Sequence, residues 1–497
     1  KLAGNVSVDP ATGRLTATFK NTPQQPFDDL KVQLKEGARA PLANPPVCGA
    51  YTTTSDLTPW STPFTPDATP ASSFEVGGCG DPGRFAPSFV AGTVNPQAGA
   101  FSPFTLSFSR QDSDQPFSGL TATLPPGLVA KLAGVPLCPD ANASAGTCPA
   151  SSQVGTVTTG AGPGSHPFFL PGRVYLTGPY RGAPYGLAVE VPAVAGPFNL
   201  GTVVVRQSLQ IDVHDAHVSA VSDPFPTILD GIPLQLRAVN VTIDRPSFVI
   251  NPTSCDPMQV AATFTSTQGA SARASSRFQA AGCADLGFAP TFTVITRAHT
   301  SKRDGASLEV KVTSGPGQAN IGKVKVDLPG QLPSRLTTLQ KACTENVFNA
   351  NPATCPEGSF VGSATAVTPL LDHQLTGPAI LVSHGGASFP DLVILLQGDG
   401  ITLQLDGQTD IKHGITSSSF ASVPDAPIST FDLTLPESPH SALGAIASLC
   451  AHPLLMPTKI TGQNGAVIKR TTRIAVTGCP RKRHVHRTHR HRRRHRR

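Results

Sequence analysis

Charge is scarce in this sequence: Asp, Glu, Lys and Arg make up 14% of its 497 residues, against about a quarter in a typical globular protein. It contains no run of about 18 apolar residues, so we expect no membrane-spanning helix. Long stretches of helical periodicity are also missing, and the best local helix candidates are short, at 127–134 and 441–449. These deficits argue against a helical enzyme and against a helical membrane protein.

Familiar catalytic signatures are missing as well. The sequence has no P-loop, no G-x-G-x-x-G, no H-E-x-x-H and no paired-carboxylate signature. The motif "SHGG" at 383–386 resembles an oxyanion loop of esterases, but such a loop needs a G-x-S-x-G elbow that this chain lacks. We therefore predict a protein that is not an enzyme and has no cofactor or metal, and we interpret "SHGG" as a loop.

Proline, glycine and short alternating segments are abundant. The chain has 49 Pro and 46 Gly, and apolar and polar residues alternate in segments such as 13–19 ("GRLTATF") and 209–221 ("LQIDVHDAHVSAV"). Alternation with period two indicates strands with one buried face, and Pro and Gly separate such strands. A hydrophobic content of 39% with 24 Phe argues against disorder. The sequence therefore predicts an all-β fold.

Internal repeats organise the chain. Three Cys-to-Cys segments, at 48–79, 255–283 and 450–479, end in a strand-like run followed by "GC". Further matches join "LPPGLVAKLAGVPLC" to "LPGQLPSRLTTLQKAC" and "TCPASSQVGTVT" to "TCPEGSFVGSAT". Such spacing predicts units of about 200 residues, each built of tandem β-sandwich-like modules.

The repeats set the expected boundaries. We predict the C-terminal part of a truncated first repeat at 1–80, a second repeat at 85–284 and a third at 285–479, followed by a disordered Arg/His-rich tail at 480–497. The second and third repeats are each expected to hold two β modules, split near 165 and near 372. Because the first repeat begins in its last third, we expect the chain to be a piece of a longer repeat protein.

The ten cysteines recur in pairs, with none left over. Local pairing within each repeat predicts five disulfides: Cys48 with Cys79, Cys138 with Cys148, Cys255 with Cys283, Cys343 with Cys355, and Cys450 with Cys479. Structural zinc is the weaker alternative, because its sites use closely spaced Cys pairs and the shortest spacing here is ten. Disulfides are typical of an oxidising compartment, so we expect a secreted protein.

Four polar or aromatic features are candidate binding sites. The motif "HDAH" at 214–217 could hold a metal, but the repeats place it at a hairpin turn, where polar residues are common. The others are acids that could bind calcium or simply face solvent, an aromatic pair that could stack on a sugar or pack in a core, and asparagines in N-x-S/T sequons. Their residues are, respectively, Asp399, Asp406 and Asp410; Trp60 and Tyr51; and Asn142 and Asn240.

The C-terminal segment concentrates positive charge. It holds ten of the 39 basic residues and no acid, so the remainder has 29 basic against 32 acidic residues. We predict that these ten bind anionic cell-envelope polymers: Arg481, Lys482, Arg483, Arg487, Arg490, Arg492, Arg493, Arg494, Arg496 and Arg497. Nucleic-acid binding and a purely solubilising role are the alternatives, and the cysteines argue against the first of these.

The repeated "LPPGL…C…CP…VGT" pattern, the closing "F…GC" strand and the Arg-rich end together resemble uncharacterised large exported repeat proteins of high-GC soil actinobacteria. The resemblance implies export and surface association, and it supplies no catalytic residue. From the sequence we predict a structural or adhesive protein of the cell surface or cell wall. A polysaccharide-binding module is the alternative, and a secreted hydrolase ranks below it.

Overall fold

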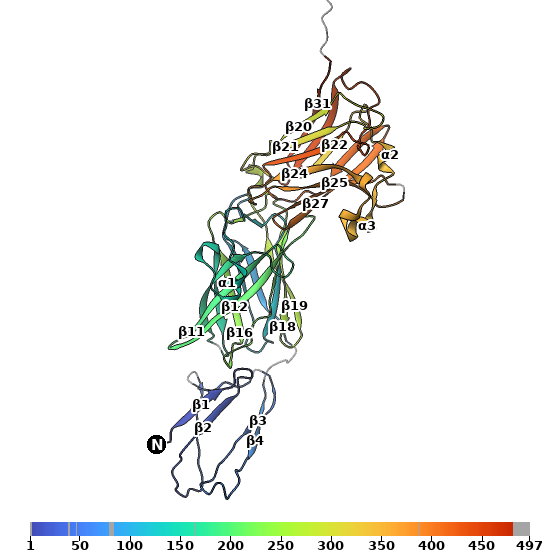
Figure 1. The fold of residues 1–497 in the computed structure, drawn as a ribbon. Coiled ribbons are helices and arrows are strands. Elements are labelled where there is room, and N and C mark those ends of the chain that lie inside the picture. Colours follow the sequence, from blue (N-terminus) through green and yellow to red (C-terminus); the bar gives the residue numbers. More distant parts are fainter. Residues whose placement is uncertain are drawn as a thin grey trace, which may run out of the picture.

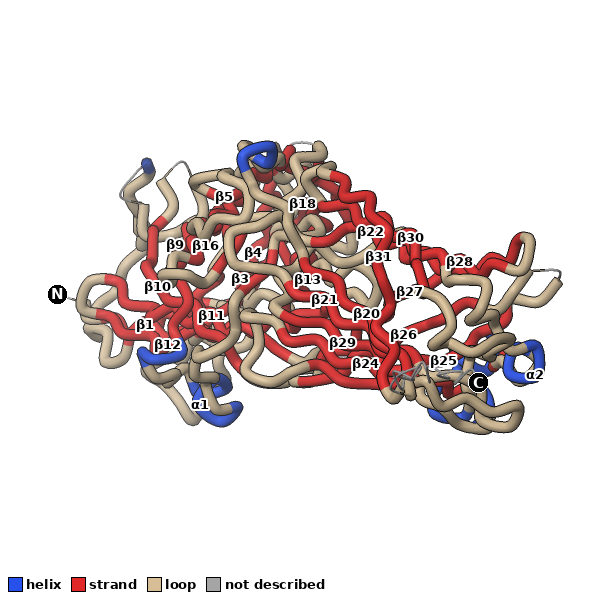
Figure 2. The backbone as a smooth tube through the Cα atoms, turned by 90° about the horizontal axis from the view of Figure 1, so that it is seen from above, coloured by secondary structure: helices blue, strands red, loops and turns tan. Residues whose placement is uncertain are grey.

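The computed structural model describes residues 2–37, 40–45, 47–78, 84–164, 166–386 and 388–480. Three units follow one another along the chain (Figure 1): an N-terminal unit with its strands between 4 and 76, a middle unit with its strands between 88 and 278, and a C-terminal unit with its strands between 291 and 477. Strands form most of the regular structure, with the short helices at its edges (Figure 2). The all-β class predicted from the sequence is confirmed. None of the described helices is long and apolar enough to cross a membrane.

The N-terminal unit consists of two separate antiparallel hairpins. Their strands are β1 (Gly4–Val8) with β2 (Leu15–Phe19), and β3 (Gly49–Thr54) with β4 (Ala71–Val76). Most of their side chains are exposed on both faces, including Val6, Phe19 and Phe74. These hairpins therefore enclose no core of their own.

The middle unit is built on one eleven-stranded antiparallel sheet. In chain order its strands are β5 (Ser88–Thr93), β6 (Phe104–Ser109), β7 (Phe117–Thr123), β9 (Gln153–Ala161), β10 (Phe168–Thr177), β11 (Tyr185–Ala195), β12 (Phe198–Ile211), β13 (Val218–Ser222), β16 (Leu236–Ile243), β18 (Met258–Ser266) and β19 (Ser271–Phe278). Two minor pairs join β8 (Val129–Ala130) to β17 (Val249–Ile250) and β14 (Ile228–Leu229) to β15 (Ile232–Pro233).

The C-terminal unit also has one main sheet, to which the short strand β23 (Cys343–Thr344) is attached through β25. Its strands are β20 (Thr291–Arg297), β21 (Leu308–Thr313), β22 (Ile321–Asp327), β24 (Phe360–Val367), β25 (Leu375–Ser383), β26 (Asp391–Gly398), β27 (Ile401–Lys412), β28 (Ile415–Phe420), β29 (Thr430–Leu435), β30 (Leu454–Gly462) and β31 (Val467–Thr477). The sheet closes on itself, because β25 pairs with both β24 and β26 and because β20 pairs with β31 in parallel.

Strand order is the same in the two sheets. The middle sheet runs β5-β6-β16-β9-β10-β11-β12-β13-β7-β18-β19, and the C-terminal sheet runs β20-β21-β29-β24-β25-β26-β27-β28-β22-β30-β31. Counted along the chain, each strand of one sheet has its counterpart at the same place in the other. One sheet crosses each unit without a break at 165 or 372, so the split into two modules expected there does not appear in the strand pairing.

Both sheets enclose an apolar core, and the two end strands of the middle sheet lie side by side. Just beyond β5 and β19, the Ala98 amide donates to the Ala281 carbonyl at 2.8 Å and the Ala281 amide donates to Pro96 at 2.9 Å. Inward positions alternate with outward ones, as in β6 and β20. Part of the middle core is a cluster of phenylalanines, including Phe108 and Phe117, whose ring centroids are 5.1 Å apart.

Short helices lie on the outer surfaces of the sheets. They are α1 (Asp140–Ala145), α2 (Leu336–Leu339), α3 (Glu345–Ala350) and the 3-10 turns at Ala150–Ser152, Cys283–Asp285, Pro352–Thr354 and Glu357–Ser359. The helices expected at 127–134 and 441–449 are wrong. Gly127 has φ +83°, outside the helical region, and Leu443 forms β-bridges to Ala306 and Ser334.

Candidate functional site

The junction between the middle and C-terminal units contains a buried carboxylate. Asp425 lies in the loop between β28 and β29 and is 6% exposed. It accepts hydrogen bonds from the middle unit: the Thr253 amide at 2.8 Å, the Thr253 hydroxyl at 2.6 Å and the Ser254 amide at 3.0 Å. The side-chain amide of Asn320, which belongs to the same unit as Asp425, donates to it at 2.8 Å. Four donors therefore compensate the cost of burying this charge.

The chain around Asp425 is shaped for close approach. A Cβ added at Gly127 would lie 2.8 Å from the Asp425 carboxylate and 2.6 Å from the Cβ of Pro252. Gly127 also has φ +83°, which side-chain-bearing residues rarely adopt. This position in the "LPPG" motif therefore needs glycine for two independent reasons, and the loop can pack directly against the junction.

Three more contacts tie the two units together away from Asp425. The amides of Leu132 and Ala133 donate to the Leu370 carbonyl at 2.8 and 2.9 Å. The Gln404 amide donates to the Val213 carbonyl at 2.7 Å, which attaches the tip of the β12–β13 hairpin to β27. The side-chain amide of Asn464 donates to the Cys283 carbonyl of the middle unit at 3.2 Å. Hydrogen bonds at separate points restrain rotation as well as separation of the units.

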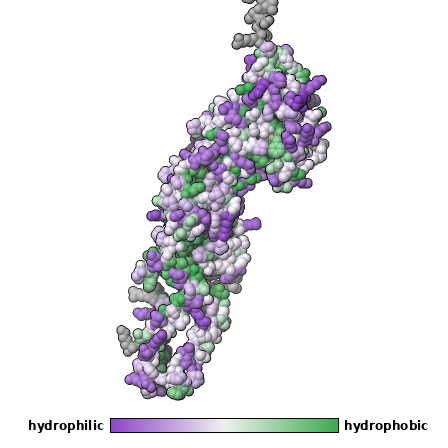
Figure 3. Space-filling model, viewed as in Figure 1, coloured by the Kyte–Doolittle hydropathy of each residue, from purple (hydrophilic) through white to green (hydrophobic). Residues whose placement is uncertain are grey.

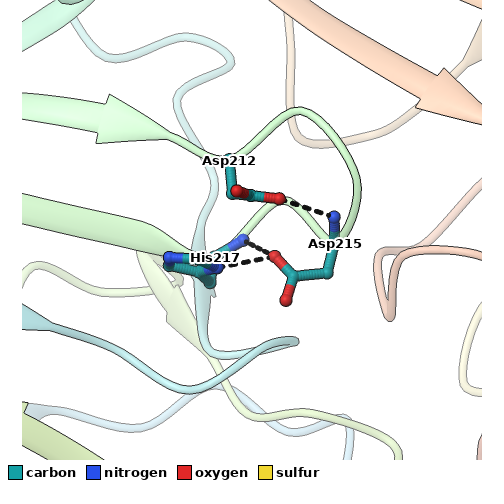
Figure 4. A group of neighbouring side chains, drawn as sticks. All are labelled: Asp212, Asp215 and His217. Atoms are coloured by element: carbon teal, nitrogen blue, oxygen red, sulfur yellow. Dashed lines mark hydrogen bonds and ion pairs between the residues drawn. The ribbon is translucent and has the colours of Figure 1, made fainter.

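The "HDAH" segment forms the β12–β13 turn, as the repeats predicted. Asp212, Asp215 and His217 lie together there (Figure 4), with ligand atoms within 4.8 Å of one another. Burial pushes the pKa of Asp212 upward, but hydrogen bonds from the backbone amides of His214 and Asp215 outweigh it and lower that pKa. Both amides donate to the same Oδ1 atom of Asp212, which stabilises the turn. The His214 ring lies 3.3 Å from the Asp406 carboxylate on the other side of the junction.

The "SHGG" loop contains ion pairs. The His384 ring nitrogens lie 3.2 Å from Glu345 and 3.1 Å from Asp391. Burial lowers the pKa of His384, but the hydrogen bond and charge of Glu345 and the charge of Asp391 raise it more, so that the net shift is upward. Within the described part of this loop, the Gly385 amide donates to the Ser383 hydroxyl at 3.3 Å. The arrangement fits a surface loop held by charge.

The other sequence candidates are dispersed. Asp399 pairs with His373 at 2.8 Å and Asp410 with Lys412 at 2.6 Å, whereas Asp406 faces His214 as described above. The three acids thus have three separate basic partners, and the structure does not gather them into one oxygen-lined site.

The aromatic and sequon candidates also lie apart from the junction. Trp60 is 59% exposed, and Tyr51 donates its hydroxyl to the Val47 carbonyl and stacks on Phe74 at 5.8 Å. Asn142 lies in α1, where its amide donates to Thr147, and Asn240 is an exposed residue of β16.

Four disulfides staple the two larger units, and they join the pairs that the repeats predict: Cys138 with Cys148, Cys255 with Cys283, Cys343 with Cys355, and Cys450 with Cys479. Cys48 is also disulfide-bonded, while its predicted partner Cys79 lies outside the described residues. The shorter loops pin α1 and α3 against the sheets. The ten predicted tail cations at 481–497 likewise lie outside the described residues.

Sequence reasoning missed the junction. Asp425 stands in "VPDAP", which has the composition of an ordinary turn, and its partner Thr253 is 172 residues away. One signal was available. Phe225 in the middle unit corresponds to Val423 in the C-terminal unit, so the residue two positions further on is Thr227 in the middle unit and Asp425 in the C-terminal unit. A difference between repeats at one loop position could have singled out this acid.

No family model and no curated protein matches the chain. Solved structures with some likeness include the B domain of a biofilm-associated protein (8% identity, 78% of this chain and 84% of that one, TM-score 0.16). A type II cohesin dyad from the ScaA scaffoldin of Acetivibrio cellulolyticus is 11% identical and covers 78% of this chain and 97% of its own, with a TM-score of 0.16. The C-terminal domain of the Streptococcus pyogenes antigen I/II-family protein AspA is 9% identical and covers 78% of this chain and 98% of its own, with a TM-score of 0.17. At these TM-scores the likeness does not define a shared fold.

Proposed function

We propose that this chain is a non-enzymatic structural or adhesive protein of the cell envelope, in which two closed β-sheets act as one rigid spacer. The junction supports this proposal most directly, because a buried Asp425 with four donors fixes the units end to end. A buried carboxylate is costly unless its partners stay in place, so bending that withdraws Thr253 and Ser254 is resisted.

The disulfides support a location outside the cell. Cross-links close loops of 28 and 29 residues around the last two strands of each unit and loops of 10 and 12 residues around α1 and α3. Stapling of this density is typical of oxidising compartments, where reducing systems do not break the bonds. A spacer exposed to that environment gains resistance to unfolding from the same bonds.

The basic tail supplies the proposed attachment. Its Arg residues suit phosphate and carboxylate groups of anionic envelope polymers through paired hydrogen bonds, and five His add charge below about pH 6.5. Such binding is electrostatic, so salt weakens it. This part of the proposal rests on composition and charge.

Binding to purified cell envelopes tests the attachment. The intact chain and a chain ending at Pro480 are compared across a salt series. We expect the intact chain alone to bind, with release as salt rises. Equal binding by both chains would refute attachment through the tail and would place recognition in the β units.

A further inference from the structure

The middle sheet encloses a cavity that its side chains do not fill. The cavity has a volume of about 360 Å³, within the roughly 300–1,000 Å³ typical of small-molecule sites. Closed sheets of about eight strands are just wide enough for side chains to fill, whereas wider ones enclose space. This sheet has eleven strands, and its inward positions on β11 and β12 are chiefly aliphatic. We propose that this cavity binds a long acyl chain, as found in fatty acids and lipids.

The lining defines the chemistry of the ligand. Among the residues that the structure describes, no charged residue lines the cavity, and only four lining side chains carry a polar atom: Thr159, Tyr185, Gln207 and Thr368. An apolar cavity holds water poorly and takes up apolar molecules instead. A ligand with charges or many hydroxyl groups would lose its hydration there without finding partners. Hydrocarbon is therefore the class that this interior accepts.

The shape favours a chain over a compact molecule. Alternate residues along β11 line the cavity from Tyr185 to Ala193, a span of eight residues or roughly 26 Å at 3.3 Å per residue. At the junction the lining continues onto the C-terminal unit through Leu370, Leu375 and Leu403. A slender flexible molecule fits a space extended along the strands, since a volume of this size spread over such a length is narrow.

The junction end gives the cavity an opening and a continuation. Ile211, Ala216 and Leu403 line it there and are partly exposed, so apolar lining reaches the surface. A second cavity of about 170 Å³ lies inside the C-terminal sheet and shares the lining residues Leu405, Val423 and Ile428 with the first. Tyr185 lies at this end, and its pKa is raised, first by burial and then by the nearby charges of Asp399 and Asp372. Its hydroxyl therefore stays neutral and can donate a hydrogen bond to a ligand headgroup.

Photolabelling the full chain with a diazirine analogue of palmitic acid tests the site. We expect saturable labelling of peptides from β11 and β12, and at least tenfold less of it when unlabelled palmitic acid is present in excess. Labelling confined to the exposed hairpins of the N-terminal unit, or labelling that excess palmitic acid does not reduce, would overturn the proposal. In a parallel arm the diazirine is carried by a phospholipid acyl chain in phosphatidylglycerol vesicles, and labelling of β11 in that arm would identify membrane lipid as a source.

A matched pair of variants separates the cavity from the surface. Val191→Phe places a ring in the cavity, whereas Val194→Phe places the same ring on the same strand at a side chain that is 45% exposed. We expect Val191→Phe to reduce β11 labelling at least tenfold and Val194→Phe to leave it unchanged. If Val191→Phe does not fold, Val203→Phe, its neighbour across the β11–β12 pair, replaces it. Unchanged labelling in a folded cavity variant would overturn the proposal.

Discussion

The two closed sheets have the same strand order but differ in how they are filled and in how they are held. The middle sheet packs a cluster of phenylalanines and still leaves a cavity of about 360 Å³, whereas the C-terminal sheet leaves about 170 Å³. At matching loops the middle unit uses Arg181 against Asp223, and the C-terminal unit uses His384 against two acids. The two units therefore share one strand order, while individual side chains determine how tightly each core is packed, how its stability depends on pH and which ion pairs hold its loops.

Disulfide removal should have the largest effect, and it should be equal in the two units. Replacing both cysteines of the 28-residue loop (Cys255 and Cys283) or of the 29-residue loop (Cys450 and Cys479) by Ser should each lower the free energy of unfolding by about 3.6 kcal/mol. The 10-residue loop at Cys138 should contribute about 2.7 kcal/mol. Denaturant titration measures these values, and clearly unequal losses for the two long loops would break the comparison.

Asp425→Ala should come next. It leaves the Thr253 and Ser254 amides without their acceptor, so we expect a loss of about 3 kcal/mol at the junction. Calorimetry of the variant should show the two units melting separately. The control is Asp432→Ala, which removes a surface pair with Lys311 and should cost less than about 1 kcal/mol. Equal effects of the two substitutions would contradict the special role of Asp425.

Adding methyl groups should distinguish the hollow sheet from the packed one. Ala193→Val fills part of the middle cavity and should stabilise by up to about 1.5 kcal/mol. Ala379→Val enters a fully buried position of the C-terminal core and should destabilise by about 1–3 kcal/mol. Thermal melting measures both. A loss of stability from Ala193→Val would mean that the middle sheet is as tightly packed as its counterpart.

The smallest effect should be a pH dependence confined to the C-terminal unit. The pKa of His384 is raised in the folded state, so its contribution to stability is complete below the unfolded value near 6.5 and disappears as pH rises through the folded value. The matching loop of the middle unit has Arg181 in place of a histidine. We expect His384→Gln to flatten the pH dependence of the stability of the C-terminal unit as pH rises above about 6.5. A profile identical to that of the unaltered chain would rule out this contribution.

Local sequence patterns predicted much of the fold. The alternating segment 13–19 contains β2, and 209–221 contains the end of β12, the turn and most of β13; the recurrent Cys spacing corresponds to the observed bonds. The strand order was out of reach, because β7 and β22 insert between strands that follow much later in the chain. The junction and the cavity were missed for a similar reason. Asp425 acquires its role from Thr253, far away in sequence, and the cavity arises from the number of strands that close the sheet.

The most direct test of the rigid spacer is a distance distribution between the two units. Spin labels on non-natural amino acids at Val90 and Leu455, both exposed, avoid the cysteines of the full chain. The account predicts a single narrow distance distribution for the unaltered chain and a broad one for Asp425→Ala. A broad distribution in the unaltered chain, or the same narrow one in the variant, would contradict it.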